Sequence, residues 1–263
     1  MGETTGAGEM KNLSHITAAI LAGGLGTRLR PVVADRPKVL AEVGGRPFIF
    51  YLLDQLAAVR VRQVVLCTGY LAHQVRDILG ETYGPMNLLY SQEPSPLGTG
   101  GALCYALPLL ESETVLVLNG DSFCEANLRA FCLVHRLRGA KVSLLLAEVT
   151  DTGRFGWVEL DGEGRITSFR EKGKATGSGW VNGGSYLINR ALLETIPTQQ
   201  IVSLEQDIFP AWIGRGLYGF RIDGRFLDIG TPESYTAAEE FFLRQEPRNF
   251  ISPQARDLMK GTR

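Results

Sequence analysis

The sequence has few of the residues that build zinc sites and disulfide frameworks. Its 263 residues include four cysteines without a Cys-x-x-Cys spacing and three scattered histidines. This pattern argues against a zinc ligand set and against a disulfide framework. Three of the cysteines stand in apolar strand or helix contexts, so we expect buried free thiols in a reducing compartment. The four are Cys67, Cys104, Cys124 and Cys132.

Long apolar runs and an excess of positive charge are also missing. No run reaches the roughly 18 residues that a bilayer-spanning helix needs. The formal net charge is −1 and no basic run stands out, which argues against a nucleic-acid-binding surface. Residues 1–15 are largely polar and glycine-containing, without the apolar core of a signal peptide, and predict a disordered tail. We therefore expect a cytoplasmic protein with no membrane partner and no nucleic-acid partner.

Strand and helix patterns alternate through the first half of the chain. Repeated βα units with apolar strands predict an α/β fold whose mostly parallel sheet is covered on both faces. Ligands of such sheets bind beyond the carboxyl ends of the strands. The predicted strands are 17–22, 62–68, 88–91, 114–118 and 142–149, and the predicted helices are 47–58, 71–79, 98–107 and 128–138.

The second half changes character. A glycine-rich turn between two apolar-polar runs predicts a hairpin over 155–169. Further strands are predicted at 181–188 and 217–222, and helices at 204–213 and 233–244. We interpret about 151–225 as an antiparallel insertion over the crevice, within one domain of residues 16–245 that is followed by a tail of 246–263.

The most informative segment follows the first predicted strand. Three glycines within four residues, Gly23, Gly24 and Gly26, allow successive N–H groups to turn toward an anion. Arg28 and Lys38 add positive charge beside them. The spacing fits neither the Gly-x-x-x-x-Gly-Lys-Ser/Thr loop nor the dinucleotide fingerprint. We interpret the segment as a triphosphate site; a tight turn with two solvated basic residues is the alternative.

This segment, Gly-Gly-x-Gly-Thr-Arg-Leu-x-Pro with a downstream Pro-Lys, resembles the signature of the sugar-1-phosphate nucleotidyltransferases (NDP-sugar pyrophosphorylases). The resemblance covers roughly residues 17–242. It implies a Rossmann-like three-layer sandwich with a mixed, mostly parallel central sheet (the GT-A-like nucleotidyltransferase fold) and a small antiparallel sugar-binding insertion. The implied reaction joins an NTP and a sugar 1-phosphate into an NDP-sugar and pyrophosphate. The implied nucleotide-binding residues are Leu21, Ala22, Gly23, Gly24, Gly26, Thr27, Arg28, Lys38, Glu93, Gly98 and Thr99, and the implied catalytic residues are Arg28, Lys38 and Asp121.

Two aspartates stand at predicted strand ends more than a hundred residues apart. Asp121 closes Asn-Gly-Asp, and Asp228 opens Asp-Ile-Gly-Thr-Pro-Glu. A triphosphate reaction needs Mg²⁺, which is held by one or two protein carboxylates with phosphate and water oxygens completing its shell. Each aspartate read alone fits a turn or a helix cap equally well. The resemblance implies that Asp121 and Asp228 are the metal ligands.

The resemblance also implies a sugar-binding side. A carboxylate accepts hydrogen bonds from vicinal hydroxyls and an ammonium pairs with a phosphate, whereas a solvated surface pair is the alternative for Glu171 and Lys172. Phe155 stands where relatives often have tyrosine, as a stacking or core residue. The implied sugar phosphate-binding residues are Gly156, Glu171, Lys172, Asn182, Gly183 and Glu205.

Glu93 precedes the Pro-Ser-Pro of a segment that resembles the family's base-reading loop. Relatives that take thymidine or uridine nucleotides often carry glutamine there. An ionised carboxylate only accepts hydrogen bonds, which suits the N1–H and N2–H₂ donors of guanine, or the amine of cytosine, better than uracil. We expect GTP. The alternative is a loop glutamate in water, with the base read by the backbone.

Within the family, the short length and several motifs look most like D-glycero-D-manno-heptose 1-phosphate guanylyltransferases. Mannose-1-phosphate guanylyltransferases and N-acetylmuramate- or hexose-1-phosphate uridylyltransferases are the rivals. A retaining glycosyltransferase would carry Asp-x-Asp, and Asp121-Ser122-Phe123 lacks the second aspartate. A non-catalytic nucleotide-sensing homologue would be expected to lose Arg28, Lys38 or an aspartate, and all are present. The sequence leaves the oligomeric state open, a homo-oligomer included.

Overall fold

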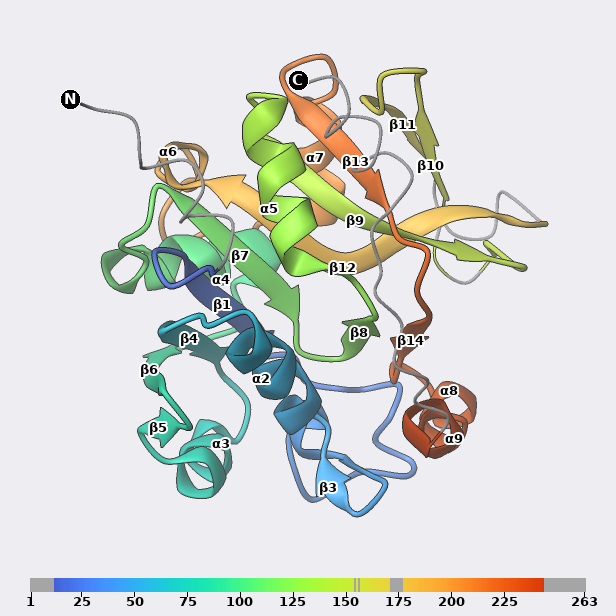
Figure 1. Cartoon of the computed structure of the whole chain (residues 1–263). Helices are drawn as coiled ribbons and strands as arrows, with labels where there is room; N and C mark the ends of the chain where they lie inside the picture. The colour runs from blue at the N-terminus through green and yellow to red at the C-terminus, as the bar shows by residue number, and fades with distance from the viewer. Residues whose placement is uncertain (1–11, 154, 156, 171–176, 244–263) are drawn as a thin grey trace.

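The structure, a computed structural model, describes residues 12–153, 155, 157–170 and 177–243 (Figure 1). An eight-stranded sheet runs through it in the order β13-β9-β12-β7-β1-β4-β6-β5. All neighbours pair in parallel except β12, which is antiparallel to β7 and β9, and β5, which is antiparallel to β6. The strands are β1 (Thr17–Ala22), β4 (Gln63–Thr68), β5 (Thr82–Tyr83), β6 (Met86–Gln92), β7 (Thr114–Asn119), β9 (Val142–Val149), β12 (Gly179–Asn189) and β13 (Leu217–Arg221).

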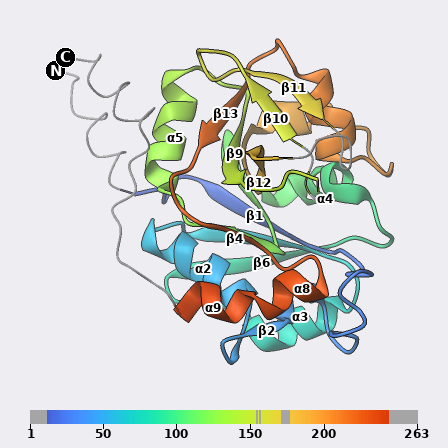
Figure 2. The same ribbon diagram turned by 90° about the vertical axis from the view of Figure 1, so that its right-hand side faces the viewer.

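Helices cover both faces of this sheet (Figure 2). Successive side chains of a strand point to opposite faces, so in β1 Ala18 and Ile20 pack on one side and Ala19 on the other. The first face carries α2 (Ile49–Ala58), α3 (Ala72–Leu79) and α5 (Leu128–Leu137). The second carries α4 (Gly98–Ala106), α6 (Arg190–Leu193) and α7 (Phe209–Ala211). The predicted three-layer arrangement around a mixed, mostly parallel sheet is confirmed.

The region expected to form an insertion, about 151–225, contributes two strands to the central sheet itself. β12 lies between β7 and β9, and β13 forms one edge. Within this region, the described antiparallel pair that stands apart from the central sheet is the hairpin of β10 (Trp157–Leu160) and β11 (Ile166–Arg170). The separate part of that region is therefore smaller than its sequence predicts.

Shorter elements complete the described chain. β8 (Ser122–Cys124) pairs with β14 (Phe226–Asp228), and β2 (Glu42–Val43) pairs with β3 (Arg46–Pro47). Two 3₁₀ turns span Lys38–Leu40 and Leu107–Leu109. The helix predicted at 204–213 is instead a π-helical turn, η3 (Leu204–Ile208), followed by α7. The described part of the predicted helix 233–244 is divided into α8 (Pro232–Thr236) and α9 (Ala238–Leu243).

The cysteines behave as the sequence predicts. Cys67, Cys104 and Cys124 are buried, Cys132 is half-buried, and all four are free thiols. Burial raises the pKa of the Cys67 thiol to about 12, which makes it unreactive at neutral pH. Among the described residues, no helix has the length and apolar character that crossing a bilayer requires.

Candidate functional site

The site begins where the central strands end. Leu21 near the end of β1 lies beside Cys67 of β4 and Asn119 of β7. Because these strands are parallel, the loops that follow them emerge at one edge of the sheet. The glycine loop after β1 and Asp121 after β7 therefore lie together, as the sequence predicts. Gly120 N–H donates to Leu21 O at 2.9 Å, which ties the two loops at their base.

A cavity of about 260 Å³ opens at this edge. Nine residues predicted for the nucleotide, catalytic or metal sites line it, namely Leu21, Ala22, Gly24, Gly26, Thr27, Arg28, Lys38, Thr99 and Asp121. Four further lining residues, Val39, Asn119, Gly120 and Gly230, were not predicted. The structure thus brings residues from four distant parts of the sequence to one concavity.

The glycine loop closes through a turn at Gly26. Gly26 has φ +59°, a conformation that favours glycine, and its carbonyl accepts from the Leu29 N–H at 2.9 Å. Leu29 is only 1% exposed and anchors the turn in the core. Arg28 is exposed beside it. Gly24 has open space where a side chain would stand, so its backbone faces the cavity unobstructed.

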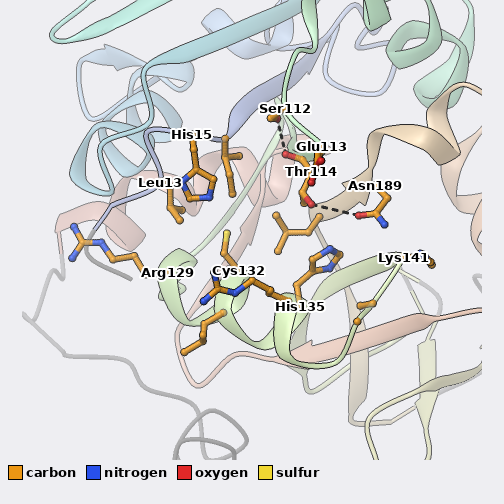
Figure 3. A pocket seen from close by; sticks show the side chains of 16 residues that line it. Leu13, His15, Ser112, Glu113, Thr114, Arg129, Cys132, His135, Lys141 and Asn189 are labelled. Carbon is orange, nitrogen blue, oxygen red and sulfur yellow. Dashed lines mark hydrogen bonds between the residues drawn. The ribbon is translucent and has the colours of Figure 1, made fainter. Parts of the chain in front are cut away.

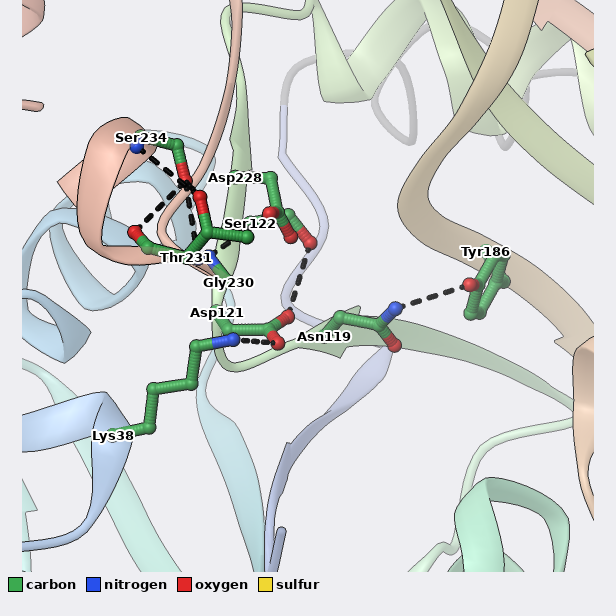
Figure 4. Close-up of polar contacts among 9 residues, drawn as sticks. All are labelled: Lys38, Asn119, Asp121, Ser122, Tyr186, Asp228, Gly230, Thr231 and Ser234. Carbon is green, nitrogen blue, oxygen red and sulfur yellow. Dashed lines mark hydrogen bonds and ion pairs between the residues drawn. The ribbon is translucent and has the colours of Figure 1, made fainter. Parts of the chain in front are cut away.

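Lys38, Asp121 and Asp228 form the charged centre of the site (Figure 4). Lys38 Nζ lies 2.6 Å from Asp121 Oδ2, and the lysine side chain is 12% exposed against 34% for the aspartate. The pairing of β14 with β8 sets Asp228 opposite Ser122. The Ile229 N–H donates to Asp121 O at 2.9 Å. A capping box between Thr231 and Ser234 begins α8 immediately afterwards.

Burial raises the pKa of Asp228, and the negative charge of Asp121 raises it further. Lys38, the Gly230 N–H and Arg28 act in the opposite direction; that N–H donates to Asp228 Oδ1 at 2.9 Å. Two neighbouring carboxylates, one of them paired with Lys38, suit a hard divalent cation that takes its other oxygens from phosphate and water. Within the described ranges, no cluster of three or more His, Cys, Asp or Glu side chains is placed to hold a metal.

Glu93 lies behind the glycine loop rather than among the residues that line the cavity. Its Oε2 accepts from the Leu97 N–H at 3.0 Å. A Cβ added at Gly23 or Gly69 would stand 2.6 or 2.8 Å from its Oε1, so both glycines make room for the carboxylate. Burial raises the pKa of this half-buried group, and the Leu97 N–H counteracts part of the rise.

Gly98 and Thr99 begin α4 as the sequence predicts. Gly98 has φ +74°, and a Cβ there would lie 2.5 Å from Val202 O, so only glycine fits this close approach. Thr99 donates to Glu205 Oε2 at 2.7 Å. Through this bond the start of α4 is attached to η3.

The residues predicted for the sugar side are described in part. Asn182 Nδ2 donates to Tyr186 Oη at 2.9 Å, and a Cβ at Gly183 would lie 2.6 Å from Cys124 Sγ. Phe155 packs edge-to-face on Phe226 with ring centroids 5.5 Å apart and lies, half-buried, against the core. Gly156, Glu171 and Lys172 lie outside the described residues.

Sequence reasoning missed several residues of the site. Asn119 belongs to the Asn-Gly-Asp motif that is interpreted for Asp121, and Tyr186 stands four residues after Asn182, which is predicted for the sugar side. Gly69 follows β4 and gives no motif of its own. Its place beside Gly23 and Glu93 depends on the pairing of β1 with β4.

A larger cavity of about 490 Å³ lies at the opposite edge of the sheet (Figure 3). Its walls come from α5, the starts of β7 and β9 and the end of β12, and they include His15, Arg129, His135 and Lys141. None of the predicted site residues lines it. Size alone therefore does not identify the functional site of this protein.

Comparison with known proteins agrees with this geometry. Residues 17–245 match the model of the Nucleotidyl transferase family. D-glycero-alpha-D-manno-heptose 1-phosphate guanylyltransferase from Aneurinibacillus thermoaerophilus is 36% identical over 224 residues, covering 85% of this chain and 96% of that protein. Mannose-1-phosphate guanylyltransferase from Mycobacterium tuberculosis is 34% identical, covering 88% of this chain and 65% of that protein.

Among solved structures, HddC from Yersinia pseudotuberculosis, crystallised in complex with GMP-PN, has a TM-score of 0.76 and 32% identity, covering 86% of this chain and 99% of that one. The family model matches most of the chain. The matched part includes the glycine loop, Lys38 and Asp121, which line the cavity at the strand ends. The chain therefore belongs to the nucleotidyl transferase family.

Proposed function

We propose that this protein transfers a guanylyl group from GTP to a sugar 1-phosphate, with a heptose 1-phosphate as the favoured acceptor, and releases pyrophosphate. The observation that carries the proposal is the cavity at the strand ends, where the glycine loop, Arg28, Lys38 and Asp121 meet. Loop N–H groups and two cations suit a triphosphate. The relatives named for sugar-phosphate guanylyltransferases support the substrate classes.

The chemistry requires positioning and charge stabilisation rather than a nucleophilic side chain. An oxygen of the sugar phosphate attacks the α-phosphorus in line, and the bond to the pyrophosphate oxygen breaks as the new bond forms. Arg28 stabilises the negative charge that accumulates on the departing pyrophosphate. Lys38 aligns the phosphates, and Lys172 is assigned to the acceptor phosphate.

Asp121 and Asp228 are the residues that would hold Mg²⁺. Their placement at the ends of β7 and β14 gives two carboxylates at one point of the site, which fits a cation that shares its shell with phosphate oxygens. When bound, the ion supplies positive charge between the reacting phosphates.

The base is assigned to guanine through Glu93. If its carboxylate accepts from guanine, GTP should be preferred over UTP by at least about 10²-fold in kcat/KM, because UTP leaves a desolvated acceptor facing another acceptor. Glu93→Gln should reduce this preference mainly by lowering GTP activity. An unchanged preference would show that Glu93 serves only to hold Leu97 and the loop, and that the backbone near Gly98 reads the base.

A matrix of four nucleoside triphosphates against heptose, mannose and N-acetylhexosamine 1-phosphates, read by pyrophosphate release, tests the proposal. We expect the highest kcat/KM for GTP with heptose 1-phosphate. Highest activity with mannose 1-phosphate would favour the second candidate, which the 34% identical relative supports. Preference for UTP would contradict the guanine assignment, and release of nucleoside diphosphate from an NDP-sugar without pyrophosphate would indicate a glycosyltransferase.

The same substrates support the expected location. Nucleoside triphosphates and sugar phosphates are intracellular metabolites, so we propose that the protein acts in the cytoplasm. Free thiols at all four cysteines agree with a reducing compartment.

A further inference from the structure

Behind the cavity, the buried hydroxyl of Tyr186 joins three elements of the fold, β7, β12 and η3. Tyr186 has no exposed surface. Its Oη accepts from Asn119 Nδ2 at 3.2 Å and from Asn182 Nδ2 at 2.9 Å, and donates to Glu205 Oε1 at 3.0 Å. Figure 4 shows the amide of Asn119 turned toward this ring. A phenol has one proton and two lone pairs, so the three contacts use its whole capacity.

The direction of these bonds is fixed by the surrounding backbone. Asn182 Oδ1 accepts from the Gly184 N–H at 2.9 Å, so the amide of Asn182 must present its Nδ2 to Tyr186. The Tyr186 proton is then available for Glu205. The second oxygen of Glu205 accepts from Thr99 Oγ1 at 2.7 Å and Ser203 Oγ at 3.0 Å. The carboxylate therefore receives three hydrogen bonds from its own chain.

The partners of Glu205 and Tyr186 belong to opposite sides of the candidate site. Thr99 and Asn119 line the cavity beside Asp121, whereas Asn182 is one of the described residues predicted for the sugar side. Glu205 and Tyr186 themselves do not line that cavity. Thr99 is held from two directions, because its Oγ1 also accepts from the Leu204 N–H at 2.8 Å.

We propose that Glu205, rather than contacting the sugar directly, is a positioning residue that acts through Tyr186 and Thr99 to keep the nucleotide side and the sugar side in register. The inference rests on the proposed function, because in-line transfer between two bound phosphates depends on their relative placement. Displacements of about 1 Å can cost roughly 10²-fold in rate. The carboxylate of Glu205 contacts Thr99 on the nucleotide side and Tyr186 toward the sugar side, and it thereby sets that placement.

The test measures binding of GTP alone, without an acceptor. Glu205→Ala and Tyr186→Phe should each weaken GTP binding by at least about threefold in calorimetric titrations, because each leaves hydroxyl or amide groups without a partner. Both should lower kcat more than they raise the KM for the sugar phosphate. The double variant should cost no more than the larger single change, since both act through one network.

Two comparisons separate positioning from a loss of folding. Glu205→Gln should recover most of the GTP affinity, because the amide oxygen can accept from Tyr186 while the amide N–H₂ donates to Thr99 and Ser203. Tyr83→Phe is the matched control. Tyr83 lies on the distant β5, and its hydroxyl donates to Asp54 Oδ1 of α2 at 2.5 Å. The control should leave GTP binding and turnover unchanged.

The inference is overturned if Glu205→Ala raises the KM for the sugar phosphate tenfold while GTP affinity stays within twofold of wild type, since that pattern marks a direct sugar ligand. Additive losses in the double variant would also overturn it. A wild-type chain that binds GTP but releases no pyrophosphate with any sugar phosphate would contradict the proposed function instead, and the GTP titrations of the variants would still decide the role of Glu205. A wild-type chain that binds no nucleoside triphosphate would overturn both.

Discussion

At the scale of single residues, the candidate site gathers charge that folding disfavours. Asp228 is partly buried near Asp121, and both its burial and that neighbour raise its pKa. Lys38 offsets part of the repulsion through its pair with Asp121. Such an arrangement is typical of sites where function and stability make opposite demands.

Replacing Asp228 should separate these demands. Asp228→Asn keeps an oxygen that can accept from the Gly230 N–H but removes the carboxylate that we propose as a metal ligand. We expect turnover at saturating nucleotide to fall by about two orders of magnitude or more, while Tm rises by about 2 °C or more as the repulsion with Asp121 disappears. Pyrophosphate release in Mg²⁺ and thermal unfolding measure the two effects. Near-normal turnover would identify Asp228 as a turn residue without a metal role.

A histidine outside the site predicts the response of the fold to acid. His135 is 5% exposed, its Nδ1 lies 2.8 Å from Ser143 Oγ, and burial lowers its pKa from 6.5 to about 4. The unfolded chain therefore takes up this proton first as the pH falls. The stability that neutral His135 contributes is present above pH 6.5 and is lost as the pH falls toward 4.

Between pH 7 and pH 5 this residue alone should lower the free energy of unfolding by about 2 kcal/mol. Urea unfolding at the two pH values measures the change, and His135→Gln provides the comparison because it removes the titrating ring. The variant should lose less stability over this interval than the wild type. Equal losses would show that His135 takes up its proton in the folded state as readily as in water.

At the scale of elements, the glycines after β1 have distinct roles. Gly26 supplies a left-handed turn and Gly23 makes room for Glu93. Gly24 meets no atom within 4 Å and does not have a positive φ. A methyl group there contacts nothing in the protein, so it can disturb only a ligand that approaches the loop.

Gly24→Ala should therefore leave Tm within about 1 °C of wild type and weaken nucleotide binding about tenfold or more, because the methyl group would hold the phosphates away from the loop N–H groups. Thermal unfolding and calorimetric titration with GTP test the two halves. Gly162→Ala, in the β10–β11 turn and equally unobstructed, is the matched control and should change neither. Unaltered nucleotide affinity in Gly24→Ala would place the triphosphate elsewhere in the cavity.

Local motifs allowed the glycine loop and its two cations to be interpreted as one phosphate site, whereas Asp121 and Asp228, each equally typical of a turn or a helix cap, were assigned only through the family resemblance. The position of β12 could not be read in the same way. Its insertion between β7 and β9 depends on pairing between segments far apart in sequence, and its apolar pattern is equally compatible with a separate sheet. The helix predicted at 204–213 begins as expected, since Ser203 accepts from the Gln206 N–H and caps the turn that starts at Leu204. It does not continue as one regular helix, because Pro210 has no N–H for the ladder of hydrogen bonds.

At the scale of the whole molecule, the last described helix returns to the N-terminal half. Phe242 of α9 stacks on Tyr51 of α2 with ring centroids 3.6 Å apart and meets Phe123 of β8 at 5.3 Å. α9 thus packs against the element that pairs with β14, the strand of Asp228. This packing supports, from outside, the part of the fold that holds Asp228.

Phe242→Ala should lower the free energy of unfolding by about 2–4 kcal/mol, since it removes a partly buried ring from an aromatic cluster. Leu243→Ala is the neighbouring control; Leu243 is 75% exposed and its truncation should change stability by less than about 0.5 kcal/mol. Denaturant unfolding of both variants makes the comparison. Equal effects would mean that α9 contributes little to holding the fold.

The pairing of β14 with β8 has a consequence for the time at which the protein becomes active during its synthesis. Asp121 leaves the ribosome more than a hundred residues before Asp228, and at about 5–20 residues per second that interval lasts several seconds or more. During it, the second carboxylate of the pair does not yet exist. Asp121 and Asp228 therefore come together only after β14 has been synthesised and has paired with β8.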